Sequence, residues 1–141
     1  MRSMTLFEAT LPWPPTVNTY WRRVGTRMLI SADGREFHRR VAQILKLRLK
    51  YDGYEVVYGR LNPIDDRVAF SIQLFPPDQR RRDIDNIAKA LLDSLQKCGV
   101  YHDDNQIDEL HIRRCKVDKL KYPSGAVNVQ IIKREESDDA D

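Results

Sequence analysis

The chain contains two stretches in which hydrophobic residues recur at steps of three and four positions. In the first stretch, which follows Ser31, the apolar positions are Phe37, Val41, Ile44, Leu45 and Leu49. In the second stretch, which precedes Gly99, they are Ile84, Ile87, Ala88, Leu91, Leu92, Leu95 and Cys98. This spacing is typical of a helix with one buried face. We therefore predict one helix that Ser31 caps and that runs through residue 49, and another from residue 84 that ends at Gly99.

Other stretches have the composition and alternation of β-strands. Residues 67–75 place Val68, Phe70, Ile72 and Leu74 on one side, which predicts a half-buried strand. Further strands are expected at 5–11, 107–117 and 126–133, together with a short hairpin made of 20–24 and 27–30. Residues 51–65 have no firm period, and they predict a loop with a short strand at 55–58.

These elements together predict an α+β (mixed α/β) fold, with a small mixed sheet and two main helices. The 141 residues are enough for one domain and few for two. We place a single domain at residues 1–134. The acidic end at residues 135–141 is expected to be a disordered tail.

The charge of the chain favours a polyanionic partner. Lys and Arg number 24 against 21 acidic residues, and since the tail is acidic, the remaining chain is more basic than the total of +3 indicates. The sequence has no apolar run of the roughly 20 residues that a membrane span needs, and its start lacks the apolar core of a signal peptide. We therefore expect a soluble cytoplasmic protein, in which Cys98 and Cys115 are reduced.

The candidate chemistry lies where the predicted strand 67–75 gives way to the second helix. The arginines at 80–82 run directly into Asp83 and Asp85. Guanidinium groups bind phosphates, and carboxylates hold Mg²⁺, which accepts oxygen ligands and keeps several waters. In an extended segment the two aspartates would project from one face about 6.5 Å apart. If Asp85 or Asn86 instead caps the helix, the exposed N–H groups there would help to hold a phosphate.

Two neighbouring features each have a plain and a functional interpretation. Lys89 follows Asp85 by one helical turn, so the two form either a surface ion pair or a site in which Lys89 stabilises a transition state. Asp103 and Asp104 follow the helix, and they form either a solvated turn or the source of a third carboxylate. The spacing alone leaves both features open.

The segment as a whole resembles the core signature of RusA-type Holliday junction resolvases. The residues that carry this resemblance are Arg80, Arg81, Arg82, Asp83, Ile84, Asp85, Asn86, Ile87, Lys89, Asp93, Leu95, Gly99, Asp103 and Asp104. The likeness continues upstream through Leu11, Pro12, Trp13, Pro14, Pro15, Asn18 and the run from Ser31 to Gly34. It covers roughly residues 5–133. The stretch 51–66 is longer than in the family, and the acidic end is additional.

The resemblance implies a RusA-like fold and a homodimer that resolves four-way (Holliday) DNA junctions by paired, symmetric nicks in recombination and repair. The family's metal ligands match Asp83, Asp85 and Asp104, which would hold Mg²⁺, with Mn²⁺ as a substitute. Lys89 matches a lysine that stabilises the transition state. Positions that match the family's DNA contacts are Thr16, Val17, Asn18, Thr19, Gln79, Arg80, Arg81, Arg82 and Asn86. Such an enzyme would be of prokaryotic or phage origin and act in the cytoplasm at the nucleoid.

Three other interpretations compete with this one. Cys98, His102, His111 and Cys115 have the spacing C-x₃-H-x₈-H-x₃-C and form a candidate zinc set. A non-catalytic module that binds branched nucleic acid would explain the arginines but would give the acidic positions no role. A metal-dependent nuclease with another substrate preference, such as flaps or single strands, would use the same residues.

Overall fold

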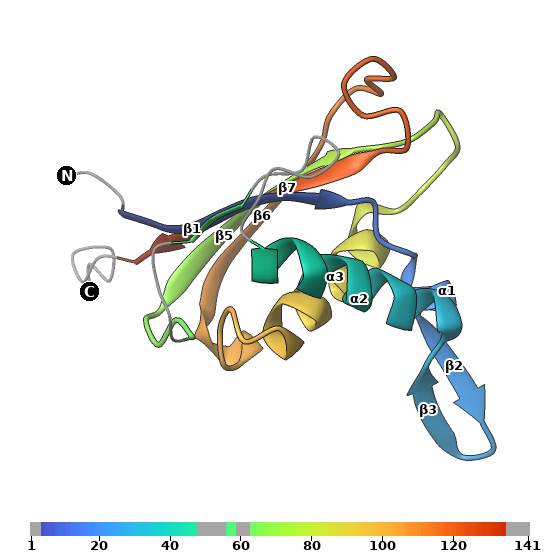
Figure 1. Cartoon of the computed structure of the whole chain (residues 1–141), viewed down its shortest axis with the longest axis horizontal. Coiled ribbons are helices and arrows are strands. Elements are labelled where there is room, and N and C mark those ends of the chain that lie inside the picture. Colours follow the sequence, from blue (N-terminus) through green and yellow to red (C-terminus); the bar gives the residue numbers. More distant parts are fainter. Residues whose placement is uncertain (1–3, 48–55, 59–62, 135–141) are drawn as a thin grey trace.

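The computed structural model describes residues 4–47, 56–58 and 63–134, in which a mixed sheet packs against two helices (Figure 1). The elements in chain order are β1 (Met4–Pro12), α1 (Val17–Tyr20), β2 (Trp21–Val24), β3 (Arg27–Ile30), α2 (Ala32–Leu47), β4 (Val56–Tyr58), β5 (Val68–Phe75), α3 (Ile84–Lys97), the 3₁₀ helix η1 (Asp104–Gln106), β6 (Ile107–Arg114) and β7 (Ala126–Lys133). The predicted α+β fold class is confirmed. None of the helices within these ranges is long and apolar enough to cross a membrane.

The main sheet has the strand order β4-β1-β7-β5-β6, and β2 and β3 form a separate hairpin. Strand β5 pairs with β6 in parallel and with β7 in antiparallel orientation. A parallel pair needs a crossover connection, and α3 supplies it because it lies between β5 and β6 in the chain. The C-terminal ends of β5 and β6 therefore lie side by side at the same end of the sheet, where Leu74 is the partner of Arg114.

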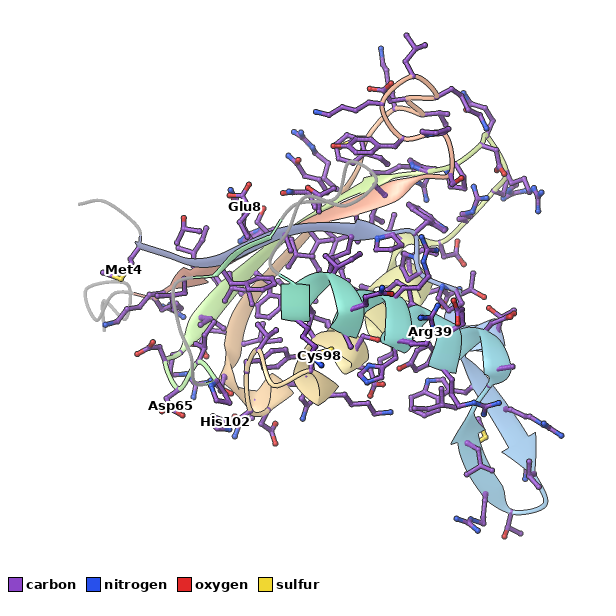
Figure 2. All side chains as sticks on the ribbon, in the orientation of Figure 1. Met4, Glu8, Arg39, Asp65, Cys98 and His102 are labelled. Carbon is purple, nitrogen blue, oxygen red and sulfur yellow. The ribbon has the colours of Figure 1, made fainter. Side chains whose placement is uncertain are left out.

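The core lies between the sheet and the helices α2 and α3, which cover the same face (Figure 1). The predicted alternation of β5 is confirmed, because its buried residues are Val68, Phe70, Ile72 and Leu74. From α3 they meet Ile87, Leu91 and Leu95 in the same cluster. Figure 2 shows Glu8 on the opposite side of the sheet, where its carboxylate accepts a hydrogen bond of 3.0 Å from Gln130. The helix-covered face is thus the apolar one.

Helix α2 begins, and helix α3 ends, as the sequence predicts. The backbone N–H of Gly34 donates to the Ser31 hydroxyl at 3.0 Å, so Ser31 caps α2. Helix α2 is described to Leu47, while residues 48 and 49 of the predicted helix lie outside the described residues. Helix α3 ends before Gly99, which has a φ of 81° and so adopts the left-handed conformation that glycine tolerates.

Several details of the prediction need correction. Tyr20 is the last residue of α1 instead of the first residue of the hairpin. Strand β6 ends at Arg114 instead of residue 117, because β5 gives way to Pro76 and Pro77, whose ring nitrogens carry no N–H for the ladder. The predicted strand at 55–58 is present as β4. The rest of the predicted loop at 51–65 lies mostly outside the described residues, and so does the tail at 135–141.

A glycine allows the start of α2 to lie directly against the end of α1. A Cβ atom at Gly34 would come within 2.6 Å of the Tyr20 carbonyl oxygen and 2.7 Å of the Ile30 side chain. Two hydrogen bonds tie the same region together. The Ser31 N–H donates to the Tyr20 carbonyl at 2.8 Å, and the Ser31 hydroxyl donates to the Thr19 carbonyl. The segment 16–19 is thereby held in place by α2.

We expect Gly34→Ala to destabilise the protein by about 1 to 3 kcal/mol, because the added methyl group forces α2 away from the Tyr20 backbone. The measurement is the free energy of unfolding from urea denaturation. Gln43→Ala, an exposed change on the same helix, serves as the control and should stay within about 0.5 kcal/mol of wild type. Equal stability of the Gly34→Ala protein and the control would contradict the close approach.

Candidate active site and nucleic-acid interface

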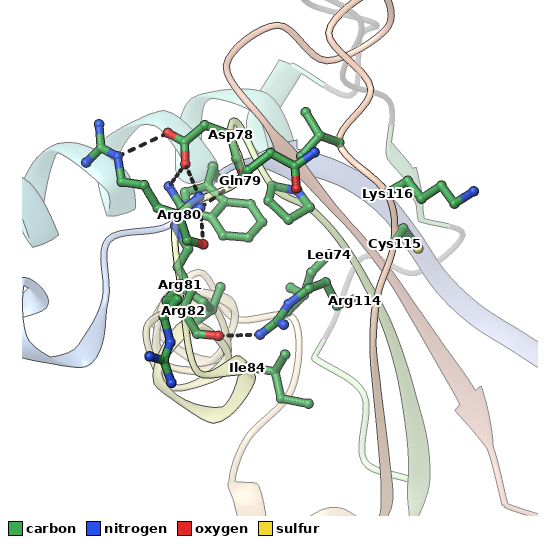
Figure 3. Close-up of a pocket in the computed structure, with 14 residues that line it drawn as sticks. Leu74, Asp78, Gln79, Arg80, Arg81, Arg82, Ile84, Arg114, Cys115 and Lys116 are labelled. Atoms are coloured by element: carbon green, nitrogen blue, oxygen red, sulfur yellow. Dashed lines mark hydrogen bonds and ion pairs between the residues drawn. The ribbon is translucent and has the colours of Figure 1, made fainter.

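The arginine segment between β5 and α3 is organised by Asp78, a residue that the sequence analysis did not identify. Its carboxylate accepts the Arg80 backbone N–H at 3.0 Å and pairs with the Arg82 guanidinium at 2.8 Å (Figure 3). The N–H group of Arg80 is the main reason that the pKa of Asp78 lies below its ordinary value, with the Arg82 side chain as a further cause. In the sequence, the four-residue spacing of Asp78 and Arg82 is the signal that could have predicted their ion pair.

The three arginines, predicted as equivalent phosphate contacts, differ in the structure. The Arg82 side chain is only 16% exposed, and its guanidinium carbon lies 5.6 Å from the centre of the Trp13 ring. Its guanidinium also donates to the Asp78 carbonyl at 3.2 Å. The Arg80 side chain is 82% exposed, and Arg81 is exposed as well. Arg80 and Arg81 therefore face solvent, whereas Arg82 is largely committed to contacts within the protein.

The acidic residues Asp83 and Asp85 lie at the N-terminal end of α3. Asp83 is the N-cap residue, with extended backbone angles and no capping hydrogen bond from its side chain, and Asp85 lies in the first turn. The sequence left open an extended pair or a helix capped by Asp85 or Asn86, and the structure shows a third arrangement, in which Asp83 is the N-cap and Asp85 is helical. Both carboxylates are exposed. The orphan N–H groups and the dipole of a helix N-terminus favour negative charge nearby.

Lys89 lies one turn further along α3 and is exposed. Among the described residues, no ion pair joins it to Asp85. The one-turn spacing that the sequence shows is used instead by Asp93 and Lys97, whose charged groups are 3.2 Å apart. The plain interpretation of Lys89 as half of a surface ion pair is thus not supported. Its ammonium group faces solvent on the helix that begins with the two aspartates.

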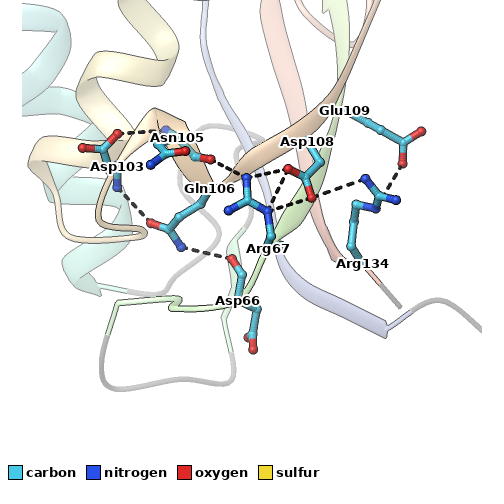
Figure 4. Close-up of polar contacts among 8 residues, drawn as sticks. All are labelled: Asp66, Arg67, Asp103, Asn105, Gln106, Asp108, Glu109 and Arg134. Carbon is cyan, nitrogen blue, oxygen red and sulfur yellow. Dashed lines mark hydrogen bonds and ion pairs between the residues drawn. The ribbon is translucent and has the colours of Figure 1, made fainter. Parts of the chain in front are cut away.

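Asp103 and Asp104 lie in a turn that is held by side chains and is not merely solvated. Asp103 caps η1 by accepting the Asn105 N–H at 2.8 Å, and the Gln106 side chain accepts the Asp103 N–H at 2.9 Å (Figure 4). The Gln106 amide also donates to the Ile64 carbonyl at 2.7 Å. Asp103 is therefore structural. The capping box was readable in the sequence as an aspartate followed three residues later by a glutamine.

The carboxylate of Asp104 is held by a buried tyrosine. The Tyr101 hydroxyl lies 2.5 Å from the Asp104 carboxylate and 3.1 Å from the Leu92 carbonyl of α3, and the Tyr101 side chain is 1% exposed. Burial, followed by the hydrogen bond to Asp104, raises the pKa of Tyr101. The tyrosine therefore stays neutral and donates. This contact places Asp104 beside the second half of α3.

A cluster of charges at the other side of the turn joins three strands. The Arg67 guanidinium, just before β5, pairs with Asp108 of β6 at 2.6 Å, and Arg134, just after β7, pairs with the same carboxylate at 3.3 Å (Figure 4). The hydrogen bond from Arg67 is the main reason that the pKa of Asp108 is lowered. Arg67 also donates to the Asn105 carbonyl at 2.6 Å. The strand ends thus support the turn that carries Asp104.

The predicted metal ligands are only partly brought together. Within the described ranges, no group of three or more His, Cys, Asp or Glu side chains is close enough to hold a metal ion. Asp83 and Asp85 share the start of α3, while Asp104 lies beside Leu92, which is about 10 Å further along the helix. Mg²⁺ is commonly held by one or two carboxylates together with substrate phosphate and water. The oxygen donors at the start of α3 fit that chemistry, but a three-carboxylate site does not form in a single copy.

The candidate zinc set does not form either. His102 pairs with Asp65 at 2.6 Å, and the two labels stand next to each other in Figure 2. His111 lies 3.7 Å from Glu109. Cys98 packs against the core, and this burial raises the pKa of its thiol to about 11. Within the described ranges, no three of these side chains gather closely enough to hold a metal ion. The zinc interpretation is not supported.

The N-terminal candidates lie on and before α1. Thr16 precedes the helix and Thr19 is exposed, whereas the side chains of Val17 and Asn18 are outside the described part. The adjacent Tyr20 is fully buried, and its hydroxyl donates to Asp93 of α3. Burial is the main reason that the pKa of Tyr20 is raised. Because Tyr20 contacts Asp93, the segment 16–19 is positioned against α3 as well as α2.

Comparison with known proteins places most of the chain in one family. The family model described as Endodeoxyribonuclease RusA matches residues 12–132. A crossover junction endodeoxyribonuclease rusA of Enterobacteria phage HK97 is 38% identical over 132 residues, which cover 94% of this chain and 98% of the relative. The protein of the same name from Enterobacteria phage 82 is 37% identical, and that from Escherichia coli K12 is 35% identical, each over 82% of this chain and 88% of the relative.

We expect Tyr101→Phe to lower the free energy of unfolding by about 1.5 to 3 kcal/mol, because it removes a hydrogen bond to a charged carboxylate. Urea denaturation measures the change. Tyr122→Phe is the matched control, because the Tyr122 hydroxyl makes no hydrogen bond within the part of the chain that the structure describes. Its effect should stay within about 0.5 kcal/mol. Similar losses in the two proteins would show that the Tyr101 hydroxyl does not bind Asp104.

Proposed function

Because the chain belongs to the endodeoxyribonuclease RusA family, we propose that it is a Mg²⁺-dependent endodeoxyribonuclease that resolves four-way (Holliday) DNA junctions. It cuts them by paired, symmetric nicks in recombination and repair. The observation that carries this proposal is the family match over residues 12–132, which includes the arginine segment, both aspartates of α3, Lys89 and Asp104. The relatives are named for cleavage of crossover junctions. The exposed basic and acidic groups at the start of α3 support the proposal.

The catalytic residues in this proposal are Asp83, Asp85, Asp104 and Lys89. Asp83 and Asp85 bind Mg²⁺ at the start of α3, and the N–H groups of the helix end favour the adjoining phosphate. When bound, the ion supplies a water of lowered pKa and neutralises charge on the scissile phosphate. Asp104 serves as the third ligand, which requires that assembly with DNA or with a second copy complete the site. Lys89 adds a fixed positive charge toward the transition state.

DNA binding uses the exposed cations and the polar groups around them. Arg80 and Arg81 bind backbone phosphates, so the affinity for DNA falls with rising salt concentration. Arg82 contributes mainly by shaping the segment, since its side chain is 16% exposed and pairs with Asp78. The remaining contacts are assigned to Gln79, Asn86, Thr16, Val17, Asn18 and Thr19.

We also propose that the protein acts as a homodimer in the cytoplasm of a bacterial cell, on DNA of the nucleoid or of a phage. A two-fold dimer presents two identical sites to a junction whose four arms are related by approximate two-fold symmetry. The sources of the relatives, which are phages and Escherichia coli, support the location. A dimer would also give each junction the two nicks that resolution requires.

We expect the wild-type protein to nick a synthetic four-way junction symmetrically with Mg²⁺ and to leave the matched duplex intact. Asp83→Asn should bind the junction within about threefold of wild type but cleave it at least 100-fold more slowly, an order of magnitude typical of lost transition-state stabilisation. Gel mapping of the nicks and binding assays measure the two effects. Asp33→Asn, an exposed aspartate of α2, is the control and should cleave normally.

The two alternative functions predict different results in the same assay. A non-catalytic binding module would bind the junction and cut nothing, with or without Mg²⁺. A nuclease with another substrate preference would cut flaps or single strands faster than the junction. Either result overturns the proposed substrate, and the second keeps the metal-dependent chemistry.

We expect Lys89→Ala to reduce the rate of junction cleavage about 100-fold while junction affinity changes by less than about threefold, because a fixed positive charge acts mainly on the transition state. Single-turnover cleavage and a binding assay separate these effects. Lys133→Ala, at the exposed end of β7, is the control for the loss of one positive charge. Equal losses in affinity and rate would reassign Lys89 to a simple phosphate contact.

A further inference from the structure

A cavity of about 520 Å³ lies between the arginine segment, the end of β5 and the chain that follows β6 (Figure 3). Its apolar lining includes Trp13, Leu74, Ile84 and Val117. Pockets for small ligands are typically 300 to 1,000 Å³, so the volume suits a ligand of about the size of one nucleotide. The cavity forms because the parallel pair β5 and β6 directs both following segments to the same end of the sheet.

One wall of the cavity contains a planar surface that is fixed before any ligand binds. The Arg82 guanidinium lies 5.6 Å from the centre of the Trp13 ring, and Asp78 holds it at 2.8 Å. Indole and guanidinium planes are the groups on which proteins stack unpaired bases. Because the protein itself holds Arg82 in place, little conformational freedom is lost when a base binds there.

The charged residues of the lining are mainly positive. They include Arg80, Arg81, Arg114 and Lys116, all of them exposed. Asp78 is the one acidic residue of the lining, and Arg80 and Arg82 already pair with it. An apolar interior with a positive rim suits a base attached to a sugar-phosphate chain, because the base leaves water while its phosphates remain at the cations.

The cavity adjoins the start of α3, where the proposed cleavage takes place. Ile84 lines it and stands between Asp83 and Asp85 in the chain. We propose that this cavity binds one nucleobase of the junction, unstacked at the point of strand exchange, beside the phosphate that is cut. This inference rests on the proposed function and adds a binding site to it. Extruding a base costs a few kcal/mol, and least where pairing or stacking is already interrupted.

The test first fills the cavity with a tryptophan side chain and then uses junctions that lack one base. We expect Val117→Trp to cleave the intact junction at least 10-fold more slowly than Leu120→Trp, which adds the same indole at a position that is 100% exposed. Junctions with a single abasic nucleotide, moved stepwise through the positions flanking the mapped cut, are then compared. At one of these positions the two variants should cleave within about twofold of each other, since no base needs the cavity. A deficit of Val117→Trp that persists with every abasic junction overturns the proposal.

Blocking the cavity reversibly distinguishes a filled cavity from a folding defect of the Val117→Trp protein. Cys115 also lines the cavity and is partly exposed. In a Cys98→Ala protein, a benzyl methanethiosulfonate attaches a benzylthio group to Cys115, and dithiothreitol removes it. Cleavage of the intact junction should fall at least 10-fold on modification and return on reduction, while cleavage of the matching abasic junction stays unchanged. Undiminished cleavage by the modified protein overturns the inference but leaves the proposed function standing. If the unmodified wild-type protein nicks no junction, the proposed function fails, and this inference fails with it.

Discussion

One carboxylate, that of Asp78, fixes the segment on which the proposed chemistry depends. It accepts a backbone N–H from Arg80 and binds the Arg82 guanidinium, which in turn lies against Trp13. This contact offsets the repulsion among three adjacent arginines, and the Arg114 guanidinium, which donates to the Arg82 carbonyl, holds the segment as well. With these contacts, two arginines face solvent, a flat surface lines the cavity, and α3 begins with its aspartates exposed. A single acidic side chain thus organises a basic surface.

The same principle holds on the other side of α3. Asp103, Gln106 and Tyr101 fix the turn that carries Asp104, and Asp108 ties the neighbouring strand ends to it through Arg67. Polar contacts to the backbone hold both loops, so their exposed charges do not depend on hydrophobic packing for position. Asp83 and Asp85 are therefore presented at the start of α3, and Asp104 is presented by η1 beside the second half of α3. In a single copy this separation keeps three negative charges apart.

Local patterns in the sequence were sufficient to predict most of the fold. The spacing of apolar residues in strand 68–74 and in the two helices reflects which side chains are buried. Ser31, which caps a helix, and Gly99, which tolerates a positive φ, mark helix ends. Asp83 and Asp85 do not lie together in an extended segment, because the helix starts at Ile84, one residue before Asp85. Asp104 lies beside Leu92 because Tyr101 contacts both residues and because α3 connects the parallel strands β5 and β6. Patterns among neighbouring residues do not predict such a contact. Arg67 and Asp108, which are far apart in the sequence, left no local signal for the same reason.

Strand β7, the last one in the described ranges, occupies an inner position in the sheet. Strand β7 lies between β1 and β5, and Met4 is paired with Lys133. In a growing chain on the ribosome, β1 and β5 are therefore without their common partner until residues 126–133 have been made. The edges of these strands that β7 covers stay open during that time, and the five-stranded sheet closes only once β7 is available. A product truncated before residue 126 would carry the arginines and aspartates, but it would lack the strand that joins the β4-β1 pair to the β5-β6 pair. The order of strands thus makes the connection between the two halves of the sheet depend on β7.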